Sequence, residues 1–153
     1  NLEPIVHLMI ALASDHAGFQ YKEKIKKLLD ELKHPYKDFG TGSTESTDYP
    51  DWAHKASESV SSGQCEQGIL VCGTGIGMSI VANKHKGVRA AVCESVTAAR
   101  RARLHNNANV LTVGERITGW ESVADIVKTF LTTSFEGGRH ERRVEKIHTL
   151  TKL

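Results

Sequence analysis

Cys72 and the glycine-rich loop after it form the strongest chemical signal in the chain. The cysteine follows the apolar run 69–71, and Gly73, Gly75 and Gly77 stand within the next five residues. A strand that passes through such a loop into a helix directs backbone N–H groups toward one point, where an anion can bind. The same donors favour the thiolate form of a nearby cysteine, which can act as a base or a nucleophile. We therefore predict an anion site with a reactive thiol at its edge.

The loop does not match two common nucleotide-binding motifs. The phosphate loop of nucleotide hydrolases needs Lys followed by Ser or Thr after its last glycine, and neither pair follows Gly77. The dinucleotide fingerprint needs a glycine where this chain has Met78. We therefore expect an anion other than a nucleotide. A tight turn beside an inert buried cysteine is the plainer alternative, although a structural turn rarely needs three glycines.

Other polar residues follow predicted strands or lie in the loops beyond them. The carboxyl ends of parallel strands meet at one edge of a sheet, where ligands of such proteins bind. We therefore expect these residues to converge on the anion site. They are Asp15, His16, Asp48, Tyr49, Cys72, Thr74 and Arg116. Taken alone, the pair Asp15 and His16 could equally be a helix cap with an exposed imidazole.

Three further residues are candidates with equally simple alternatives. His105 could carry protons near neutral pH, or it could lie at a helix end and stabilise the helix dipole. Arg139 and Arg143 are four residues apart, so on a helix they share a face that could grip one oxyanion. Solvated arginines are the commoner explanation for such a pair.

Strand-like apolar runs alternate with amphipathic helical segments along the chain, which predicts a parallel sheet covered by helices on both faces. In the helix 95–105 we expect Arg100, Arg101 and Arg103 to lie on a solvated face. The expected strands are 9–13, 36–39, 69–71, 88–92 and 109–113. The expected helices are 19–34, 52–61, 78–84, 95–105, a segment after Gly119, and a last one with Val144, Ile147 and Leu150.

Length and composition favour one domain over residues 9–153, with residues 1–8 as an expression remnant or an N-terminal extension. The chain has 153 residues, of which 39% are hydrophobic and 25% charged. Its net charge of +2 is too small to argue for nucleic acid or a membrane surface as a partner. Cys65, Cys72 and Cys93 form no C-x-x-C pair, which argues against disulfides and a zinc site and for the cytoplasm. We expect Cys65 and Cys93 to be structural.

Six motifs, in order along the chain, resemble the type B ribose-5-phosphate isomerases. They are ASDHAG (13–18), TDYPD (47–51), CGTGIGMSIVANK (72–84), GVRAAV (87–92), RLHNNANVLTVGER (103–116) and FEGGRHERRVEKI (135–147). The resemblance implies a three-layer α-β-α Rossmann-like sandwich with a five-stranded parallel sheet. It also implies a homodimer, in some relatives a tetramer, with active sites shared between subunits and no metal or other cofactor.

The resemblance further implies interconversion of ribose 5-phosphate and ribulose 5-phosphate through an enediolate, with Cys72 as the base. Some members of the family have a glutamate base where this chain has Met78, so the cysteine subtype is implied. The remaining roles concern sugar and phosphate. Thr74 and His105 would open the sugar ring, Gly73, Gly75 and Gly77 would hold the oxyanion, and Asp15 and Tyr49 would contact the sugar. His16, Arg116, Arg139 and Arg143 match phosphate-binding positions, and His105 and Asn106 would come from the partner subunit.

The resemblance leaves the sugar open, because relatives act on allose 6-phosphate or galactose 6-phosphate. From the residues alone, a phosphate-sensing or nucleotide-binding module without catalysis is a second hypothesis, but it gives Cys72, Thr74 and His105 no task. A thiol redox enzyme is a third, and the missing C-x-x-C spacing counts against it.

Overall fold

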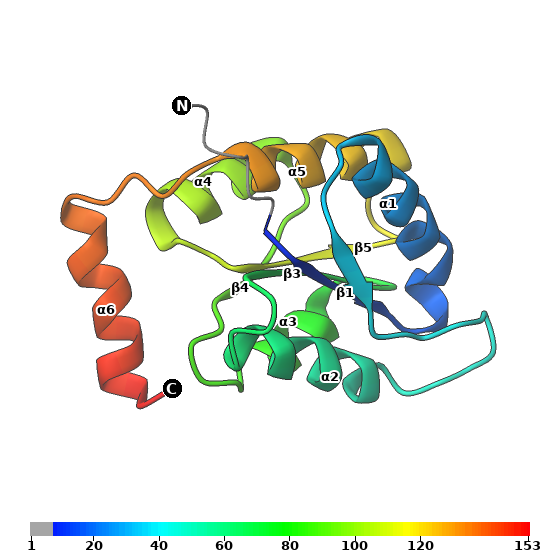
Figure 1. Ribbon diagram of the computed structural model, residues 1–153, viewed down its shortest axis with the longest axis horizontal. Helices are drawn as coiled ribbons and strands as arrows, with labels where there is room; N and C mark the ends of the chain where they lie inside the picture. The colour runs from blue at the N-terminus through cyan, green and yellow to red at the C-terminus, as the bar shows by residue number, and fades with distance from the viewer. Residues whose placement is uncertain (1–7) are drawn as a thin grey trace, which may run out of the picture.

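The computed structural model describes residues 8–153 and is built around a five-stranded sheet with the order β2-β1-β3-β5-β4 (Figure 1). All neighbouring strands are parallel, which confirms the predicted sheet. The strands are β1 (Ile10–Ser14), β2 (Tyr36–Asp38), β3 (Gln67–Cys72), β4 (Ala90–Val92) and β5 (Val110–Gly114). The expected N-terminal extension falls largely on residues 1–7, which lie outside the described part.

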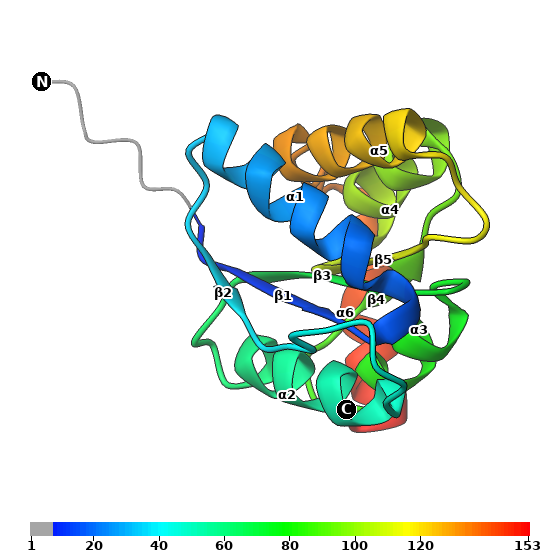
Figure 2. The ribbon, with the colours of Figure 1, turned by 90° about the vertical axis from the view of Figure 1, so that its right-hand side faces the viewer.

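Helices cover both faces of the sheet and complete the three predicted layers (Figures 1 and 2). On one face lie α1 (Phe19–Glu31), α4 (Val96–Asn106) and α5 (Trp120–Thr132), and on the other lie α2 (Tyr49–Ser61) and α3 (Ile76–Ala82). A short 3-10 helix, η1 (His16–Gly18), leads into α1. Among the described residues, no helix is long and apolar enough to cross a bilayer.

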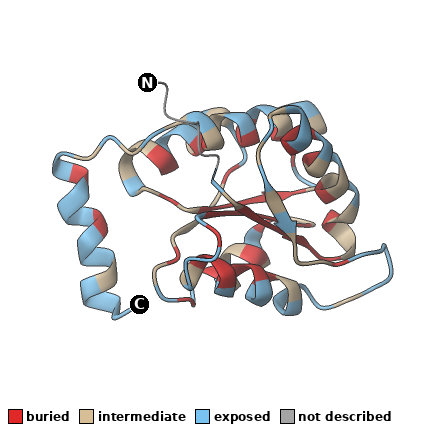
Figure 3. Cartoon of the chain, in the orientation of Figure 1, coloured by how far each residue is buried: buried red, intermediate tan, exposed pale blue. Residues whose placement is uncertain are grey.

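The alternation of side chains along the strands separates two cores. In β1, Ile10 and Leu12 belong to the cluster beneath α1, α4 and α5, whereas Ala11 and Ala13 belong to the cluster beneath α2 and α3. Successive side chains of a strand point to opposite faces, so a strand covered on both sides must be apolar throughout. Figure 3 shows the central strands β1, β3 and β5 buried throughout, whereas the edge strands β2 and β4 are only partly buried. Cys72 belongs to the α2–α3 side.

Two helices begin earlier than the sequence pattern predicted. Helix α2 starts at Tyr49 because Pro50, which we had placed in the preceding loop, suits the first helical turn. Helix α3 starts at Ile76 because Gly75 takes a left-handed conformation with φ of 78° and turns the chain straight into the helix. Both shifts bring the N-terminal turn of a helix to the carboxyl edge of the sheet.

The prediction of a solvated arginine face on α4 was wrong for Arg103. Its side chain is buried and donates hydrogen bonds to the carbonyl oxygens of Thr133 and Ala108, at 3.0 and 2.7 Å, and to Oδ1 of Asn107 at 2.8 Å. A guanidinium with several fixed acceptors can be buried at acceptable cost. Arg103 therefore closes the end of α4, while Arg100 and Arg101 are exposed as expected.

Helix α6 (Arg139–Thr151) stands beside the β4 edge of the sheet, crosses the direction of the strands, and lies apart from the two helical layers (Figure 1). Two contacts attach its C-terminal half. Nη1 of Arg89 lies 2.9 Å from Nε2 of His148, and the backbone N–H of Gly87 donates to the carbonyl oxygen of Leu153 at 2.9 Å. The predicted last helix is thus present, but most of its surface is exposed.

Candidate active site

A pocket at the carboxyl ends of β1, β3 and β5 brings together most of the residues predicted to act on a ligand. Its volume is about 420 Å³. Its walls are Asp15, His16, Ala17, Tyr49, Cys72, Gly73, Thr74, Ile76, Gly77, Ile80 and Arg116. The expected convergence at this edge of the sheet is therefore present for Tyr49 and for the residues that follow β1, β3 and β5, whereas Asp48, the residue before α2, is not part of the lining.

Cys72 is held at the start of the glycine loop. Its side chain is 5% exposed, and the backbone N–H of Gly75 donates to Sγ at 3.1 Å. The next hydroxyl, Oγ1 of Thr74, accepts from the N–H of Ile76 at 3.2 Å. From β5, the buried Thr112 donates through Oγ1 to the carbonyl oxygen of Gly75 at 2.8 Å. The loop is thus fixed by the sheet while its thiol faces the pocket.

Close approach explains why two loop positions have to be glycine. A Cβ on Gly77 would lie 2.7 Å from Cε2 of Tyr49, so the missing side chain leaves room for the tyrosine ring against α3. A Cβ on Gly75 would lie 2.9 Å from the backbone carbon of Val113 in β5. At Gly73 an added Cβ would meet the side chain of Arg116 at 3.4 Å, which shows that this guanidinium lies along the loop.

Asp15 and His16 are positioned by local hydrogen bonds. Asp15 is buried, and its Oδ1 accepts from the N–H of Gly18 at 3.0 Å, so it caps η1. Nδ1 of His16 accepts from the N–H of Thr47 at 3.1 Å, which leaves the hydrogen of a neutral ring on Nε2. The capping alternative is therefore correct for Asp15, and both residues also line the pocket.

The remaining predicted residues do not reach this pocket in the same chain. His105, Asn106 and Arg143 line a separate pocket of about 390 Å³ between α4 and α6. His105 and Asn106 end the helix that leads into β5, so they lie at the amino end of that strand, whereas Cys72 ends β3. A strand of this length separates the two edges by roughly 15 Å. Arg139, the first residue of α6, is exposed and lines neither pocket.

His140 and Glu136 lie beside His105 and were not among the site residues predicted from the sequence. The rings of His105 and His140 stack with centroids 4.3 Å apart, and Nε2 of His105 lies 3.5 Å from Oε2 of Glu136. Loss of hydration, followed by the nearby charge of His105, lowers the pKa of His140, with Arg139 and Arg143 acting in the same direction. The spacing of Glu136 and His140, four residues apart, was the available signal.

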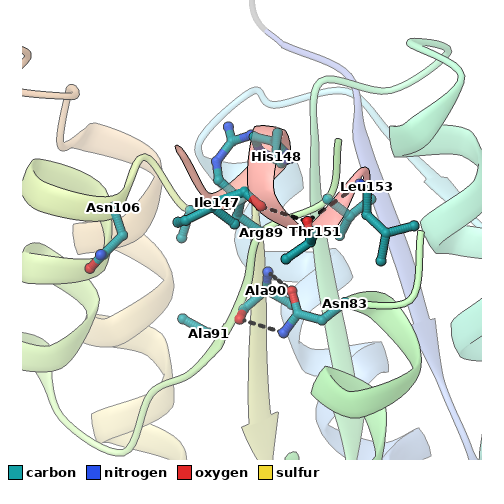
Figure 4. A pocket seen from close by; sticks show the side chains of 11 residues that line it. Asn83, Arg89, Ala90, Ala91, Asn106, Ile147, His148, Thr151 and Leu153 are labelled. Atoms are coloured by element: carbon teal, nitrogen blue, oxygen red, sulfur yellow. Dashed lines mark hydrogen bonds between the residues drawn. The ribbon is translucent and has the colours of Figure 1, made fainter. Parts of the chain in front are cut away.

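A third cavity of about 400 Å³ lies between the C-terminal half of α6 and the amino end of β4 (Figure 4). Ile147, Thr151 and Leu153 line it from one side, and Arg89 and Ala90 from the other. Of the predicted site residues only Asn106 lines it. Because this lining is mostly apolar, we regard the cavity as a packing feature of α6.

The two other cysteines are buried away from the Cys72 pocket. Cys65 and Cys93 are each 1% exposed, and neither lines a described pocket with predicted site residues. Burial raises the pKa of the Cys93 thiol to about 11, so this thiol stays protonated at neutral pH. Their placement fits the structural role expected for them.

Comparison with known proteins gives a consistent result. The family model described as Ribose/Galactose Isomerase matches residues 10–147. Ribose-5-phosphate isomerase B of Escherichia coli is 46% identical over 138 residues, which cover 90% of this chain and 93% of that protein. D-erythrulose-4-phosphate isomerase of Pectobacterium atrosepticum is 41% identical over 141 residues, covering 92% and 93% of the two chains.

Solved structures agree with the sequence relatives. The structure of ribose-5-phosphate isomerase B of Clostridium thermocellum superposes with a TM-score of 0.93 at 48% identity, over 95% of this chain and 98% of that one. The family model and both relatives cover most of the chain, and the residues that the family model matches include the Cys72 pocket, the end of α4 and the start of α6. The chain belongs to the ribose/galactose isomerase family.

Proposed function

We propose that the protein is an aldose–ketose isomerase that interconverts ribose 5-phosphate and ribulose 5-phosphate. The observation that carries this proposal is the thiol of Cys72, hydrogen-bonded to the Gly75 N–H and facing a pocket that also holds His16 and Arg116. One side of this pocket offers a base, and another offers the guanidinium of Arg116 and the imidazole of His16 as hydrogen-bond donors for a phosphate. Two relatives that cover most of the chain are named as isomerases of sugar phosphates, which agrees with this chemistry.

In the proposed reaction, Cys72 takes a proton from C2 of the open-chain aldose and returns it to C1. The intermediate is an enediolate, and backbone N–H groups of the Gly73–Gly77 loop stabilise its oxyanion. Asp15 and Tyr49 hold the sugar hydroxyls. Thr74 takes part in opening the sugar ring, which must precede proton transfer because the cyclic form has no carbonyl group.

We further propose that the site is completed by a second copy of the chain. His105, Asn106 and Arg143 lie at the opposite edge of the sheet from Cys72, so one chain holds two separate half-sites. In a homodimer, the half-site with His105 would face the Cys72 pocket of the partner. His105 would then act in ring opening, and Arg139 and Arg143 would bind the phosphate together with His16 and Arg116.

The surface around the Cys72 pocket supports this assembly. Ile76 and Ile80, on α3 at the pocket wall, are 53% and 57% exposed. Large apolar side chains that stay exposed at the rim of a pocket are typical of a surface that another protein covers. A partner there would also exclude water from the enediolate. Whether such dimers form tetramers, and whether the protein acts in the cytoplasm, stay predictions, as does the single domain over residues 9–153.

The identity of the sugar phosphate is the part of the proposal with alternatives. The family description names galactose beside ribose, and one relative is named D-erythrulose-4-phosphate isomerase. The alternatives are therefore galactose 6-phosphate, a four-carbon substrate and the allose 6-phosphate that the sequence resemblance left open. A non-catalytic phosphate-binding module is a weaker alternative, because it needs no thiol beside the loop.

The deciding experiment is an isomerisation assay over ribose 5-phosphate, allose 6-phosphate, galactose 6-phosphate and D-erythrulose 4-phosphate. We expect the highest kcat/KM with ribose 5-phosphate. A higher value with another sugar would change the substrate but keep the reaction. Binding of ribose 5-phosphate without turnover of any sugar in the panel would favour the non-catalytic module.

A further inference from the structure

Three side chains outside the sugar-phosphate pocket converge at the surface of the α2–α3 layer. His54 and Glu58 lie one turn apart on α2, and His85 lies in the turn after α3. Nδ1 of His54 is 2.8 Å from Nε2 of His85, and that nitrogen is 3.9 Å from Oε1 of Glu58. One ligand atom from each residue lies within 4.8 Å of the others. We propose that this cluster is a binding site for a divalent transition-metal ion, with Zn²⁺ as the best fit.

The protonation of His85 is suited to metal binding. Its Nδ1 lies 3.0 Å from the carbonyl oxygen of Val81 and 3.2 Å from that of Ala82. Carbonyl oxygens only accept hydrogen bonds, so Nδ1 carries the ring hydrogen and the lone pair of Nε2 points toward His54 and Glu58. Histidines that bind metals usually donate their other ring N–H in this way, which fixes both the tautomer and the ring orientation.

Metal binding needs only a small rearrangement of His54. Without an ion, Nδ1–H of His54 donates to Nε2 of His85 across the 2.8 Å contact. With an ion between them, the hydrogen of a neutral His54 ring moves to Nε2, so that Nδ1 presents its lone pair. This exchange of tautomers changes no net charge, and the exposed His54 ring is free to give its new N–H to water.

The donor set and its spacing favour zinc. Two imidazole nitrogens and one carboxylate oxygen are common zinc ligands, and a water molecule can complete the tetrahedron. Ligand atoms about 2.0–2.1 Å from a tetrahedral ion are roughly 3.3 Å from one another. The 2.8 and 3.9 Å separations found here lie on either side of that value. The Glu58 side chain is 61% exposed, so it can turn toward the ion without disturbing the core.

The surroundings hold the ligands in place. His85 is 8% exposed, and the hydroxyl of Ser61 on α2 donates to the carbonyl oxygen of Lys86 at 2.6 Å, which fastens α2 to the turn that carries His85. An ion would add a second fastening between α2 and α3, which lie side by side in Figure 2. None of the three ligands lines the Cys72 pocket, so the expected effect of the ion is on stability rather than on chemistry.

The experiment titrates the chelator-treated full-length protein with Zn²⁺ by calorimetry and with Co²⁺ by visible absorption. We expect one equivalent per chain and a Co²⁺ spectrum of tetrahedral type. The exposed positions His54→Ala and Glu58→Gln should each weaken Zn²⁺ binding by at least about tenfold. They should also abolish the rise in melting temperature that Zn²⁺ produces in the wild type.

Two controls separate this site from the other places where zinc could bind. His105→Ala removes a ligand from the cluster of His105, Glu136 and His140, which has a similar arrangement, and Cys72→Ala removes the pocket thiol. Both variants should bind Zn²⁺ as the wild type does. Unchanged affinity in His54→Ala and Glu58→Gln, loss of binding in either control, or no saturable binding by the wild type would each overturn the proposal.

Discussion

At the scale of the residue, the protein gives Cys72 and Cys93 different environments. Cys72 meets a backbone N–H and a pocket, whereas burial keeps the thiol of Cys93 protonated, with a pKa of about 11. A thiol acts as a base only as the thiolate. Of these two cysteines, Cys72 is therefore the one whose surroundings suit it to move a proton.

Replacing Cys72 with alanine tests this assignment. We expect kcat to fall by about 10²–10⁴-fold, because a positioned base contributes this much. Ketose formation measures the loss, and circular dichroism checks that the fold is kept. Cys93→Ala is the matched control and should keep most of the activity. Turnover by Cys72→Ala within about tenfold of the wild type would remove the proposed base.

A second test concerns the space that Gly77 leaves for Tyr49. In Gly77→Ala the new Cβ would lie 2.7 Å from the present position of the tyrosine ring, which is 40% exposed and can move away. We therefore expect KM for the sugar phosphate to rise severalfold, with a change in stability below about 1 kcal/mol. Gly42→Ala, where nothing lies within 4 Å, is the control. If Gly77→Ala raises KM equally in a Tyr49→Ala background, the tyrosine is not the cause.

At the scale of the element, the buried Lys22 fastens α1 to the end of β2 through an ion pair with the partly buried Asp38, and to the following loop through Thr41. The side chain of Lys22 is 0% exposed, and its Nζ donates to Oδ2 of Asp38 at 2.7 Å and to the carbonyl oxygen of Thr41 at 2.6 Å. This loop continues to Thr47, whose N–H donates to His16 in the pocket. The ion pair thus supports one wall of the candidate site from a distance.

Removing the lysine should destabilise the fold. Lys22→Met leaves Asp38 without its buried partner, and because Asp38 keeps Lys26 and some water, we expect a loss of about 2–3 kcal/mol in the free energy of unfolding. Urea unfolding measures it. Lys27→Met, at an exposed position of the same helix, should change the value by less than about 0.5 kcal/mol. Equal effects of both substitutions would show that the ion pair adds little.

The same ion pair makes the free energy of unfolding depend on pH in the acidic range. Burial acts to raise the pKa of Asp38, but hydrogen bonds from Lys22, the Gly40 N–H and Lys26 together hold it below the ordinary value of 3.8. A lowered pKa in the folded state means that this stabilisation is present above about pH 4 and is lost as the pH falls through the folded value. In Lys22→Met the pKa of Asp38 is lowered less. The difference in the free energy of unfolding between the wild type and Lys22→Met should therefore shrink below pH 4. A constant difference would contradict the linkage.

At the scale of the whole molecule, the parallel topology places two residues of the proposed reaction, Cys72 and His105, at opposite edges of the sheet. A residue that ends a strand lies at the carboxyl edge, and a residue that ends the helix before a strand lies at the amino edge. Cys72 is of the first kind and His105 of the second. No loop movement in one chain brings two edges of a rigid sheet together, so the role proposed for His105 can be filled only by a second copy.

Subunit exchange tests the shared site. Mixing inactive Cys72→Ala and His105→Ala chains forms heterodimers in which one site carries both lesions and the other carries none. With random exchange at equal amounts, about a quarter of wild-type activity should return. Cys72→Ala mixed with Thr74→Ala is the control, because both lesions lie on the same half-site and every site stays damaged. No recovery despite proven exchange would place each site within one chain.

The sequence by itself determined the layers of the fold and the reactive end of one half-site. Apolar runs and amphipathic segments are local patterns, so the alternation of strand and helix could be predicted in order, with errors of a few residues where Gly75 and Pro50 start helices early. The convergence of Asp15, Cys72 and Arg116 followed from the topology, because parallel strands end at one edge.

Only the tertiary structure decided which distant residues meet. The burial of Arg103, the stack of His105 on His140 and the contact of His54 with His85 join side chains from separate elements, and no local period encodes such pairs. Spacing along the chain shows which side chains share a helix face, but not what packs against that face. For that reason the lining of the two separate pockets, including His140 beside His105, follows from the tertiary structure and not from the spacing of residues along the chain.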